Sequence, residues 1–250
     1  MIAIGVSVED RAGVRQIVLD RPDKKNALTV AMYGVLADAI ASAAQDDVGA
    51  LLITARGDTF TAGNDLRDFL EQPPHGEDAP VSRFLRGLVT TDVPIVAAVR
   101  GAAVGIGTTM LLHCDVVLAS PTAKFKVPFV DLGLVPEAGS SVLLARRIGR
   151  ARAGAALYLG ETIAADQAYA DGLVTKLVAD DALDAEAEAA ARAIAAKPRQ
   201  AVRETKRLVT YDRDEILAAM AREGAAFQVR LASDEARAAM SAFFQRGQRG

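Results

Sequence analysis

A single carboxylate, Glu137, stands at the end of the apolar segment VPFVDLGLVPEAGSS, which covers residues 127–141. One interpretation is a surface turn, in which the glutamate is solvated and chemically ordinary. The other is a partly dry pocket, where burial disfavours the charged form and raises the pKa of a carboxyl group. A carboxylate in such a pocket could act as a general base, because proton transfer is most efficient when the base titrates near the working pH.

Two glycine-containing loops could supply the second half of such a site. The loops ARGDTFTAGNDLRDF (residues 55–69) and RGAAVGIGTTMLLHCD (residues 100–115) each follow an apolar, strand-like run. Glycine lets the backbone approach a ligand closely, and asparagine tolerates a positive φ. Together the loops could direct two N–H groups at one oxygen, which is the geometry of an oxyanion hole. Taken alone, the first loop is more typical of a simple turn, and the second is equally compatible with tight packing of a strand against a helix.

Other chemistries do not fit these residues. The dinucleotide-binding motif fails because its third glycine position holds Met110, and the phosphate-loop spacing fails because its lysine would fall on Gly107. No zinc-ligand spacing is present, so we expect no metal and no separate cofactor. Ser140 and Ser141 lack the strand-to-helix elbow of a serine nucleophile. We expect them to cap the helix SSVLLARRI, which Gly149 would end.

Composition narrows the function classes further. The 250 residues are 51% hydrophobic, which allows one large domain or one domain with a small appendage. A formal net charge of −3 disfavours general binding to nucleic acid or to an anionic membrane. The chain shows neither a signal peptide nor an apolar run near the ~20 residues of a membrane span. The single cysteine, Cys114, fits a reducing compartment, so we expect a cytoplasmic protein.

The candidate loops must be positioned by the elements around them. Most strand-like runs are continuously apolar, as expected for strands that are buried on both faces. They cover residues 14–19, 50–55, 95–99, 115–119 and 173–178. A helical stripe of apolar residues between 32 and 40 follows Thr29, which is a good N-cap. This alternation of strand and helix predicts an α/β fold with crossover connections.

Two segments differ from this alternation. Residues 71–82 are polar and rich in proline and glycine, which predicts a surface loop. From about Asp180 the chain is helical through Gln245 without a convincing strand, and candidate helix starts are Asp181, Asp212 and Ser233. We therefore expect a helical region appended to an α/β core.

Six segments, taken in order, resemble the enoyl-CoA hydratase/isomerase family, also called the crotonase family. They are LDRPDKKNALT (19–29), FTAGNDL (60–66), VRGAAVGIGTTMLLHCDVVLAS (99–120), VDLGLVPEAGSS (130–141), AADQAYADGLVTKLV (164–178) and KPRQAVRETK (197–206). The resemblance spans nearly the whole chain. It implies a crotonase-like spiral of ββα units over residues 1–195. It also implies a C-terminal helical region, residues 196–250, that supports a homotrimer or a dimer of trimers.

The resemblance also implies a substrate and a set of site residues. The substrate would be an acyl-CoA thioester, bound without a metal, and the partners would include neither nucleic acid nor membrane. The backbone N–H groups of Asn64 and Ile106 would form the oxyanion hole for the thioester carbonyl. Coenzyme A would lie near Lys24, Ala62, Asp65 and Leu66, and Phe243 would approach coenzyme A bound to a neighbouring chain.

The sequence departs from the pattern of the hydratases in this family, which use two glutamates to add water. Thr109 stands at the first of these positions, and Phe129, after Pro128, stands at the second. Members that keep only the glutamate matching Glu137 resemble Δ3,Δ2-enoyl-CoA isomerases, in which one carboxylate moves a proton between C2 and C4. Thr109, Phe129 and Leu134 would then line the acyl pocket.

Three functions remain open at this point. We favour the isomerase, with Glu137 as the proton shuttle. The alternative is a hydratase, or another crotonase reaction in fatty-acid or aromatic-acid degradation, that uses Glu137 or the rival base Asp131. The third is a non-catalytic acyl-CoA-binding protein. Desolvation would raise the pKa of Glu137, whereas a helix beginning near Ser140 would lower it, and the sequence does not decide between the two effects.

Overall fold

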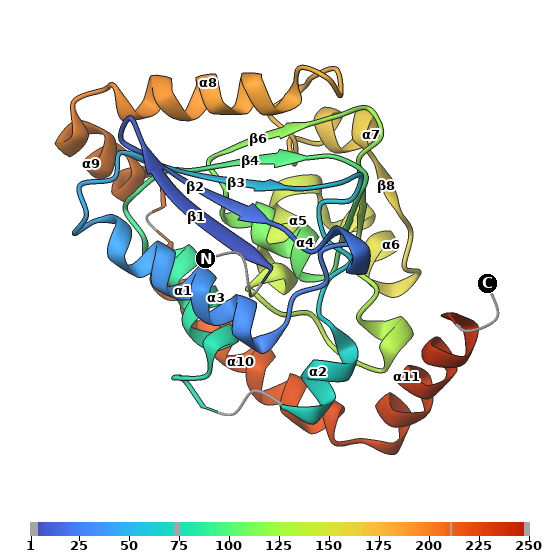
Figure 1. Ribbon diagram of the computed structural model, residues 1–250. Coiled ribbons are helices and arrows are strands. Elements are labelled where there is room, and N and C mark those ends of the chain that lie inside the picture. The colour runs from blue at the N-terminus through green and yellow to red at the C-terminus, as the bar shows by residue number, and fades with distance from the viewer. Residues whose placement is uncertain (1–4, 73–75, 211, 248–250) are drawn as a thin grey trace.

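A twisted sheet, mostly parallel, forms the centre of the protein (Figure 1). The computed structural model describes residues 5–72, 76–210 and 212–247. Along the sheet the strands follow the order β1 (Val6–Arg11), β2 (Val14–Leu19), β3 (Ala50–Ala55), β4 (Ile95–Val99), β6 (Val116–Ala119) and β9 (Lys176–Leu177). Only β1 runs antiparallel to its neighbour in this sheet, and the other pairs are parallel.

A smaller sheet is built from β5 (Ala102–Val104), β7 (Lys124–Lys126) and β8 (Ile163–Ala164). Strand β5 follows β4 after a corner at Gly101, and β7 follows β6 in the same way. The corner requires glycine, because a Cβ atom at Gly101 would lie 1.9 Å from the carbonyl oxygen of Asp58. The chain therefore winds as a spiral that places one strand in each sheet per turn, which confirms the predicted α/β spiral.

The inner strands β3, β4 and β6 are apolar, apart from Thr54, because both faces of the sheet are covered there. On one face, residues such as Leu52, Val96 and Leu118 pack against α8 (Leu183–Ala195). The alternate residues of the same strands point to the opposite face of the sheet. There they pack in the main core, which contains α1 (Val30–Ala43) and α3 (Pro80–Thr90). Figure 1 shows α8 along one face of the sheet, with α1 and α3 on the opposite side.

The helices agree with most of the predicted positions. Thr29 caps α1 by accepting the N–H of Met32 at 3.2 Å. The C-terminal helix starts predicted near Asp181, Asp212 and Ser233 correspond to α8, to α10 (Arg213–Leu231) and to α11 (Asp234–Gly247). The remaining helices are η1 (Pro22–Lys24), α2 (Leu66–Glu71), α4 (Ile106–Thr109), η2 (Met110–His113), η3 (Val130–Leu132), α5 (Ser140–Ile148), α6 (Arg150–Tyr158), α7 (Ala165–Ala170) and α9 (Arg199–Val209).

Several predicted boundaries were wrong. The strand expected over residues 173–178 shortens to β9, and the one expected over 115–119 begins one residue later. The loop expected over 71–82 ends at Ala79, because Pro80 suits the first turn of α3 and begins that helix. Residues 73–75 of that segment lie outside the described residues. Strands β1, β5, β7 and β8 were not predicted, since β1 is largely exposed and the other three have two or three residues.

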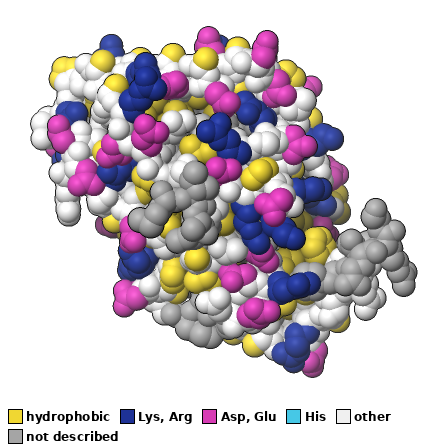
Figure 2. All heavy atoms as spheres, in the orientation of Figure 1, with side chains coloured by type: hydrophobic (Ala, Val, Ile, Leu, Met, Phe, Trp, Pro, Cys, Tyr) yellow, Lys and Arg dark blue, Asp and Glu magenta, His cyan; other side chains and the backbone are white. Residues whose placement is uncertain are grey.

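Charged side chains of both signs are interspersed over the face drawn in Figure 2, without an extended area of one sign. This distribution agrees with the small net charge of −3. Among the described helices, none has both the length and the apolar character needed to cross a membrane.

Lys206 connects α9 to the amino ends of the inner strands β4 and β6. Its side chain is 4% exposed, and Nζ donates to Asp115 Oδ2 at 2.9 Å and to the carbonyl oxygen of Val93 at 3.0 Å. Removing the ammonium group would leave the partly buried carboxylate of Asp115 without its cationic partner, with the N–H of Ile95 at 2.7 Å as a remaining donor. We therefore predict that Lys206→Met lowers the free energy of unfolding by about 2–4 kcal/mol, measured by urea unfolding.

The control for this variant is Lys176→Met, which breaks the exposed Lys176–Glu186 pair at 2.7 Å. That change should alter the free energy of unfolding by less than about 1 kcal/mol, because solvent screens an exposed ion pair. Similar losses in the two variants would contradict the special role of Lys206.

Candidate active site

The spiral brings corresponding loops of successive turns together. Thr61 pairs with Ala103 in a parallel bridge, and Ala103 pairs with Phe125 in the register of β5 and β7. Asn64 lies three residues after Thr61, and Ile106 lies three residues after Ala103. Because Thr61 and Ala103 pair with each other, Asn64 and Ile106 occupy corresponding positions of the two neighbouring loops. The structure thus brings together the two residues that were predicted to form the oxyanion hole.

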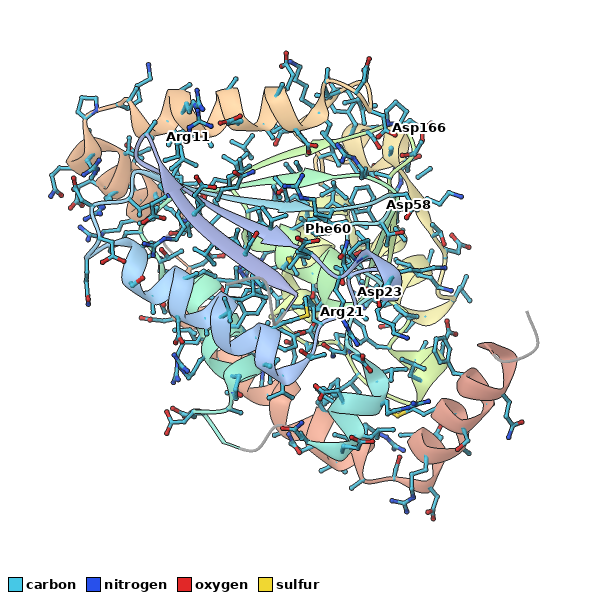
Figure 3. All side chains as sticks on the ribbon, viewed as in Figure 1. Arg11, Arg21, Asp23, Asp58, Phe60 and Asp166 are labelled. Atoms are coloured by element: carbon cyan, nitrogen blue, oxygen red, sulfur yellow. The ribbon has the colours of Figure 1, made fainter. Side chains whose placement is uncertain are left out.

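These loops leave the sheet at the carboxyl ends of its parallel strands. Figure 3 shows Arg21 and Asp23, which follow β2, and Asp58 and Phe60, which follow β3, at the same end of the sheet. Arg11, in the hairpin between β1 and β2, lies at the opposite end. Ligands of open α/β sheets commonly bind outside the carboxyl ends of the strands, so the candidate site has the expected location.

Among the hydrogen bonds of the described residues, none engages the backbone N–H of Asn64 or that of Ile106, the first residue of α4. Each follows a glycine in the left-handed region, Gly63 with φ +92° and Gly105 with φ +57°. A Cβ atom at Gly63 would lie 2.9 Å from the carbonyl oxygen of Val104, so the two loops are in close contact. Two unpaired donors in adjacent loops are what an oxyanion hole requires.

Tyr33 of α1 holds the side chain of Asn64 in place. The tyrosine is buried, and its hydroxyl donates to Asn64 Oδ1 at 2.5 Å. Burial, followed by the negative charge of Glu137, raises the pKa of Tyr33 well above its ordinary value, so the hydroxyl keeps its proton. The sequence analysis did not include Tyr33 in the site. The sequence feature that could have identified Tyr33 is the hydroxyl group that it adds beside the apolar stripe of α1.

Glu137 lies in the turn between η3 and α5, where it is partly buried. Thr109 of α4 is fully buried and donates from Oγ1 to Glu137 Oε1 at 2.5 Å. Burial raises the pKa of Glu137 to about 7, against the opposing effect of the Thr109 hydrogen bond and with a further increase from the charge of Glu223. Desolvation therefore outweighs the Thr109 hydrogen bond, and Glu137 can take up or release a proton near neutral pH.

The start of α5 differs from the prediction. The N-cap is Gly139 with φ +72°, and neither Ser140 nor Ser141 caps the helix with its side chain. The hydroxyl of Ser140 instead donates to the carbonyl oxygen of Glu137 at 2.6 Å. The carboxylate of Glu223, on α10, accepts the N–H groups of Gly139 at 2.6 Å and Ser141 at 2.9 Å. A buried carboxylate from a distant helix has taken the place of the local serine caps.

The three residues predicted to line the acyl pocket are all buried. Thr109 contacts Glu137 directly, and Phe129 and Leu134 are each 6% exposed. The N–H of Leu134 donates to the carbonyl oxygen of Phe129 at 2.8 Å, which closes the loop around η3. Asp131, the rival base, is exposed on η3 and faces Lys126 Nζ at 3.7 Å. Its surroundings are those of a surface residue.

Four residues predicted near coenzyme A lie close together. The N–H of Ala62 donates to the carbonyl oxygen of Lys25 at 2.9 Å, which places Ala62 beside Lys24. The N–H of Asp65 bonds Leu28 at 2.8 Å, and Leu66 begins α2 directly afterwards. The carboxylate of Asp65 is already engaged, by Arg21 at 2.8 Å and as the cap of α2.

Phe243, the fifth of these residues, lies on α11, the helix that projects from the body of the molecule in Figure 1. Its side chain is 48% exposed. The buried face of α11 contains Ala236 and Met240, and Ala236 packs against Gly133 at the end of η3. The predicted approach of Phe243 to coenzyme A on a neighbouring chain stays a prediction.

A groove of about 1020 Å³ lies behind the Glu137 turn, between η2 and α9. Its lining includes His113, Lys206 and Ile216, and none of the predicted site residues is part of it. The described residues contain no group of three or more His, Cys, Asp or Glu side chains that could hold a metal ion.

The family model described as enoyl-CoA hydratase/isomerase matches residues 9–249. The chain belongs to the enoyl-CoA hydratase/isomerase family. Among curated members, it is 34% identical over 225 residues to enoyl-CoA delta isomerase 2 of Rattus norvegicus, covering 88% of this chain and 58% of the length of that protein. It is also 34% identical over 239 residues to the probable enoyl-CoA hydratase echA8 of Mycobacterium leprae, covering 94% and 92% of the two chains.

Solved structures of the enoyl-CoA hydratase/isomerase family share the whole fold. The crystal structure of an enoyl-CoA hydratase/isomerase from Pseudoalteromonas atlantica T6c superposes with a TM-score of 0.93 at 42% identity, and the match covers 97% of both chains. The family and the crotonase fold are thus confirmed. Equal identity to an isomerase and to a hydratase leaves the choice of reaction to the residues of the site.

Because the pKa of Glu137 is raised in the folded protein, we expect the free energy of unfolding to depend on pH. The pKa of Glu137 rises from an ordinary value of 4.5 to about 7, so the folded state disfavours the ionised form. This destabilisation is absent below pH 4.5, grows as the pH rises and is complete above about pH 7. Glu137→Gln removes the ionisable group, so it should stabilise the protein more at pH 8 than at pH 4.5. We predict that the change in the free energy of unfolding caused by Glu137→Gln is up to about 3 kcal/mol more favourable at pH 8 than at pH 4.5.

Urea unfolding of the wild type and of Glu137→Gln at both pH values measures this difference. Glu161→Gln, which removes an exposed glutamate, is the matched control and should show no such gain. A change in stability that is the same at both pH values would contradict the burial of an ionisable Glu137.

Proposed function

We propose that this protein is a Δ3,Δ2-enoyl-CoA isomerase, in which one carboxylate moves a proton along an acyl-CoA thioester. The observation that carries the proposal is the surroundings of Glu137. Its carboxylate is half-buried, has a pKa of about 7 and is held by a threonine hydroxyl. The positions that carry glutamates in similar hydratases hold Thr109 and Phe129. Glu223 is close enough to influence Glu137, but both its oxygens accept backbone N–H groups.

The proposed reaction uses the two loops and Glu137 together. The thioester carbonyl of a 3-enoyl-CoA would accept hydrogen bonds from the N–H groups of Asn64 and Ile106. Glu137 would then remove a proton from C2, and the electron pair would move into a dienolate whose charge rests on the carbonyl oxygen. Each donor in such a hole lowers the barrier by about 3–4 kcal/mol. The same proton would return at C4, so the product is the conjugated 2-enoyl-CoA.

The pKa of Glu137 suits both halves of this reaction. A base with a pKa of about 7 is substantially ionised at neutral pH, and its conjugate acid is acidic enough to release the proton again. The described hydrogen bond engages Oε1, which leaves Oε2 for the transferred proton. The buried side chains of Phe129 and Leu134 would keep water away from the dienolate.

The remaining features of the proposal come from membership of the family. We propose that Lys24, Ala62, Asp65 and Leu66 surround coenzyme A, with Asp65 contributing its backbone because its carboxylate is engaged. Phe243 would approach coenzyme A on a neighbouring chain of a homotrimer or a dimer of trimers, supported by residues 196–250. The reaction moves only a proton and needs no further cofactor. We place the protein in the cytoplasm.

A panel of 2-enoyl and 3-enoyl thioesters tests the reaction directly. The wild type should convert a 3-enoyl-CoA into the conjugated 2-enoyl-CoA, which is followed by the absorbance of the conjugated thioester. Glu137→Gln should lower kcat by about 10²–10⁴-fold, the range that a general base contributes, because glutamine cannot accept the proton. Coenzyme A binding and the melting temperature should be retained, and Glu161→Gln should react like the wild type.

Other outcomes of this panel point to the alternatives. Formation of a 3-hydroxyacyl-CoA from crotonyl-CoA would favour a hydratase. Thermal stabilisation by every thioester without turnover would favour an acyl-CoA-binding protein. Activity of Glu137→Gln near that of the wild type would rule out Glu137 as the shuttle.

The Thr109 hydroxyl makes a separate prediction about pH. Its hydrogen bond favours the ionised form of Glu137 and lowers the pKa of that carboxyl group. Thr109→Val removes the hydroxyl and keeps the shape, so the pKa of Glu137 should rise. The low-pH limb of kcat/KM for a 3-enoyl-CoA should move to higher pH by about one unit. Thr109→Ser keeps a hydroxyl and should restore the wild-type profile, and an unmoved limb in Thr109→Val would refute this role.

A further inference from the structure

Glu223 connects the C-terminal helical region to the candidate active site. It lies on α10 and is 7% exposed, although it is charged. Its Oε2 accepts the N–H of Gly139 at 2.6 Å, and its Oε1 accepts the N–H of Ser141 at 2.9 Å. These N–H groups belong to the start of α5, directly after Glu137. The carboxylate therefore reaches from one helix to the turn that carries the proposed base of the reaction.

The Glu137 turn has a backbone that needs support. Ala138 has φ +58° and Gly139 has φ +72°, so two consecutive residues occupy the left-handed region, which is unfavourable for alanine. On one side of the turn, His113 Nε2 lies 2.7 Å from the carbonyl oxygen of Ala138 and must donate its proton there. On the other side, Glu223 accepts the N–H of Gly139. The turn is thus held from both sides.

Helix α10 is packed firmly enough to serve as this support. A Cβ atom at Gly139 would lie 2.9 Å from Ile216 Cγ2 of α10, so the helix touches the turn itself. Arg146 of α5 bonds Asp212 at 2.7 Å and Glu215 at 2.6 Å, at the start of the same helix. The position of Glu223 is therefore fixed relative to α5.

The charges around Glu137 give this contact a chemical consequence. The first N–H groups of a helix favour a nearby negative charge, and a free start of α5 would stabilise ionised Glu137. Glu223 occupies that place and adds a negative charge of its own. The other titratable groups that face Glu137 or its turn are Tyr33 of α1 and His113 of η2, and burial lowers the pKa of His113 to about 4, which leaves it neutral. No Lys or Arg among the described residues forms a salt bridge with Glu137.

We propose that Glu223 is a positioning residue for the reaction at Glu137: it fixes the turn of residues 137–139 and occupies the start of α5, so that Glu137 remains able to accept and to release a proton. This inference rests on the proposed function of the same site. It gives the C-terminal helices a part in catalysis in addition to their expected part in assembly.

The test is the titration of Glu137 in Glu223→Gln. Glutamate labelled with ¹³C at the carboxyl carbon reports each titration by NMR, and the signal of Glu137 is assigned as the one lost in Glu137→Gln. Loss of the neighbouring negative charge should lower the titration midpoint of Glu137 by about half a pH unit or more. The low-pH limb of kcat/KM for a 3-enoyl-CoA should shift in the same direction, which a merely structural role would not produce.

Asp214→Asn is the matched control, because it removes an exposed carboxylate from the same helix and should leave the midpoint unchanged. If Glu223→Gln does not fold, Glu223→Ser is a second neutral variant whose small side chain lets water reach both N–H groups. An unchanged Glu137 midpoint in a folded neutral variant overturns the inference. The NMR titration needs no turnover, so a wild type inactive on 3-enoyl-CoA would overturn the proposed function and leave this result readable.

Discussion

Backbone pairing between successive turns of the spiral is the constraint on which the site depends. Thr61 donates its N–H to Ala102 at 3.0 Å and accepts the N–H of Val104 at 3.0 Å, so the two loops are joined as neighbouring strands. Paired strands lie about 4.8 Å apart, which is close enough for two N–H groups to reach one oxygen. The approach also requires glycine, because a Cβ atom at Gly107 would lie 2.5 Å from Thr61 Cγ2. The closeness of the two loops is thus a consequence of the fold.

A buried asparagine supports the same arrangement from the N-terminal side. Asn26 is fully buried, and its amide group donates to the carbonyl oxygens of Arg56 and Thr59, each at 2.8 Å. Its side-chain oxygen accepts the N–H of Arg21 at 2.8 Å. A buried polar group with three satisfied hydrogen bonds is rigid, and loss of any one partner is expensive. The loop after β2 is therefore held against the loop after β3, where Asn64 lies.

The sequence revealed those parts of the structure whose signals are local. Mostly apolar runs predicted β2, β3 and β4 correctly, because these strands are largely buried, and Thr29 marked the start of α1. Glu137 and the two loops were found from residue types at short spacing. Tyr33 and Glu223 were missed because their partners lie 31 and 84 positions away. The three-residue strands β5 and β7 were missed because neighbouring turns of the spiral, rather than local preference, determine them.

The two glutamates beside the start of α5 support the proposed one-base reaction. Hydration would require a second group that activates water while Glu137 handles the other proton. The nearest candidate, Glu223, would first have to release the N–H groups of Gly139 and Ser141. Hydrogen bonds to charged groups are worth about 1.5–3 kcal/mol each, so this release would be costly. Glu137 accepts a single hydroxyl and keeps one oxygen for proton exchange. The same turn thus anchors one carboxylate and leaves the other reactive, which favours a reaction that returns the proton it removes.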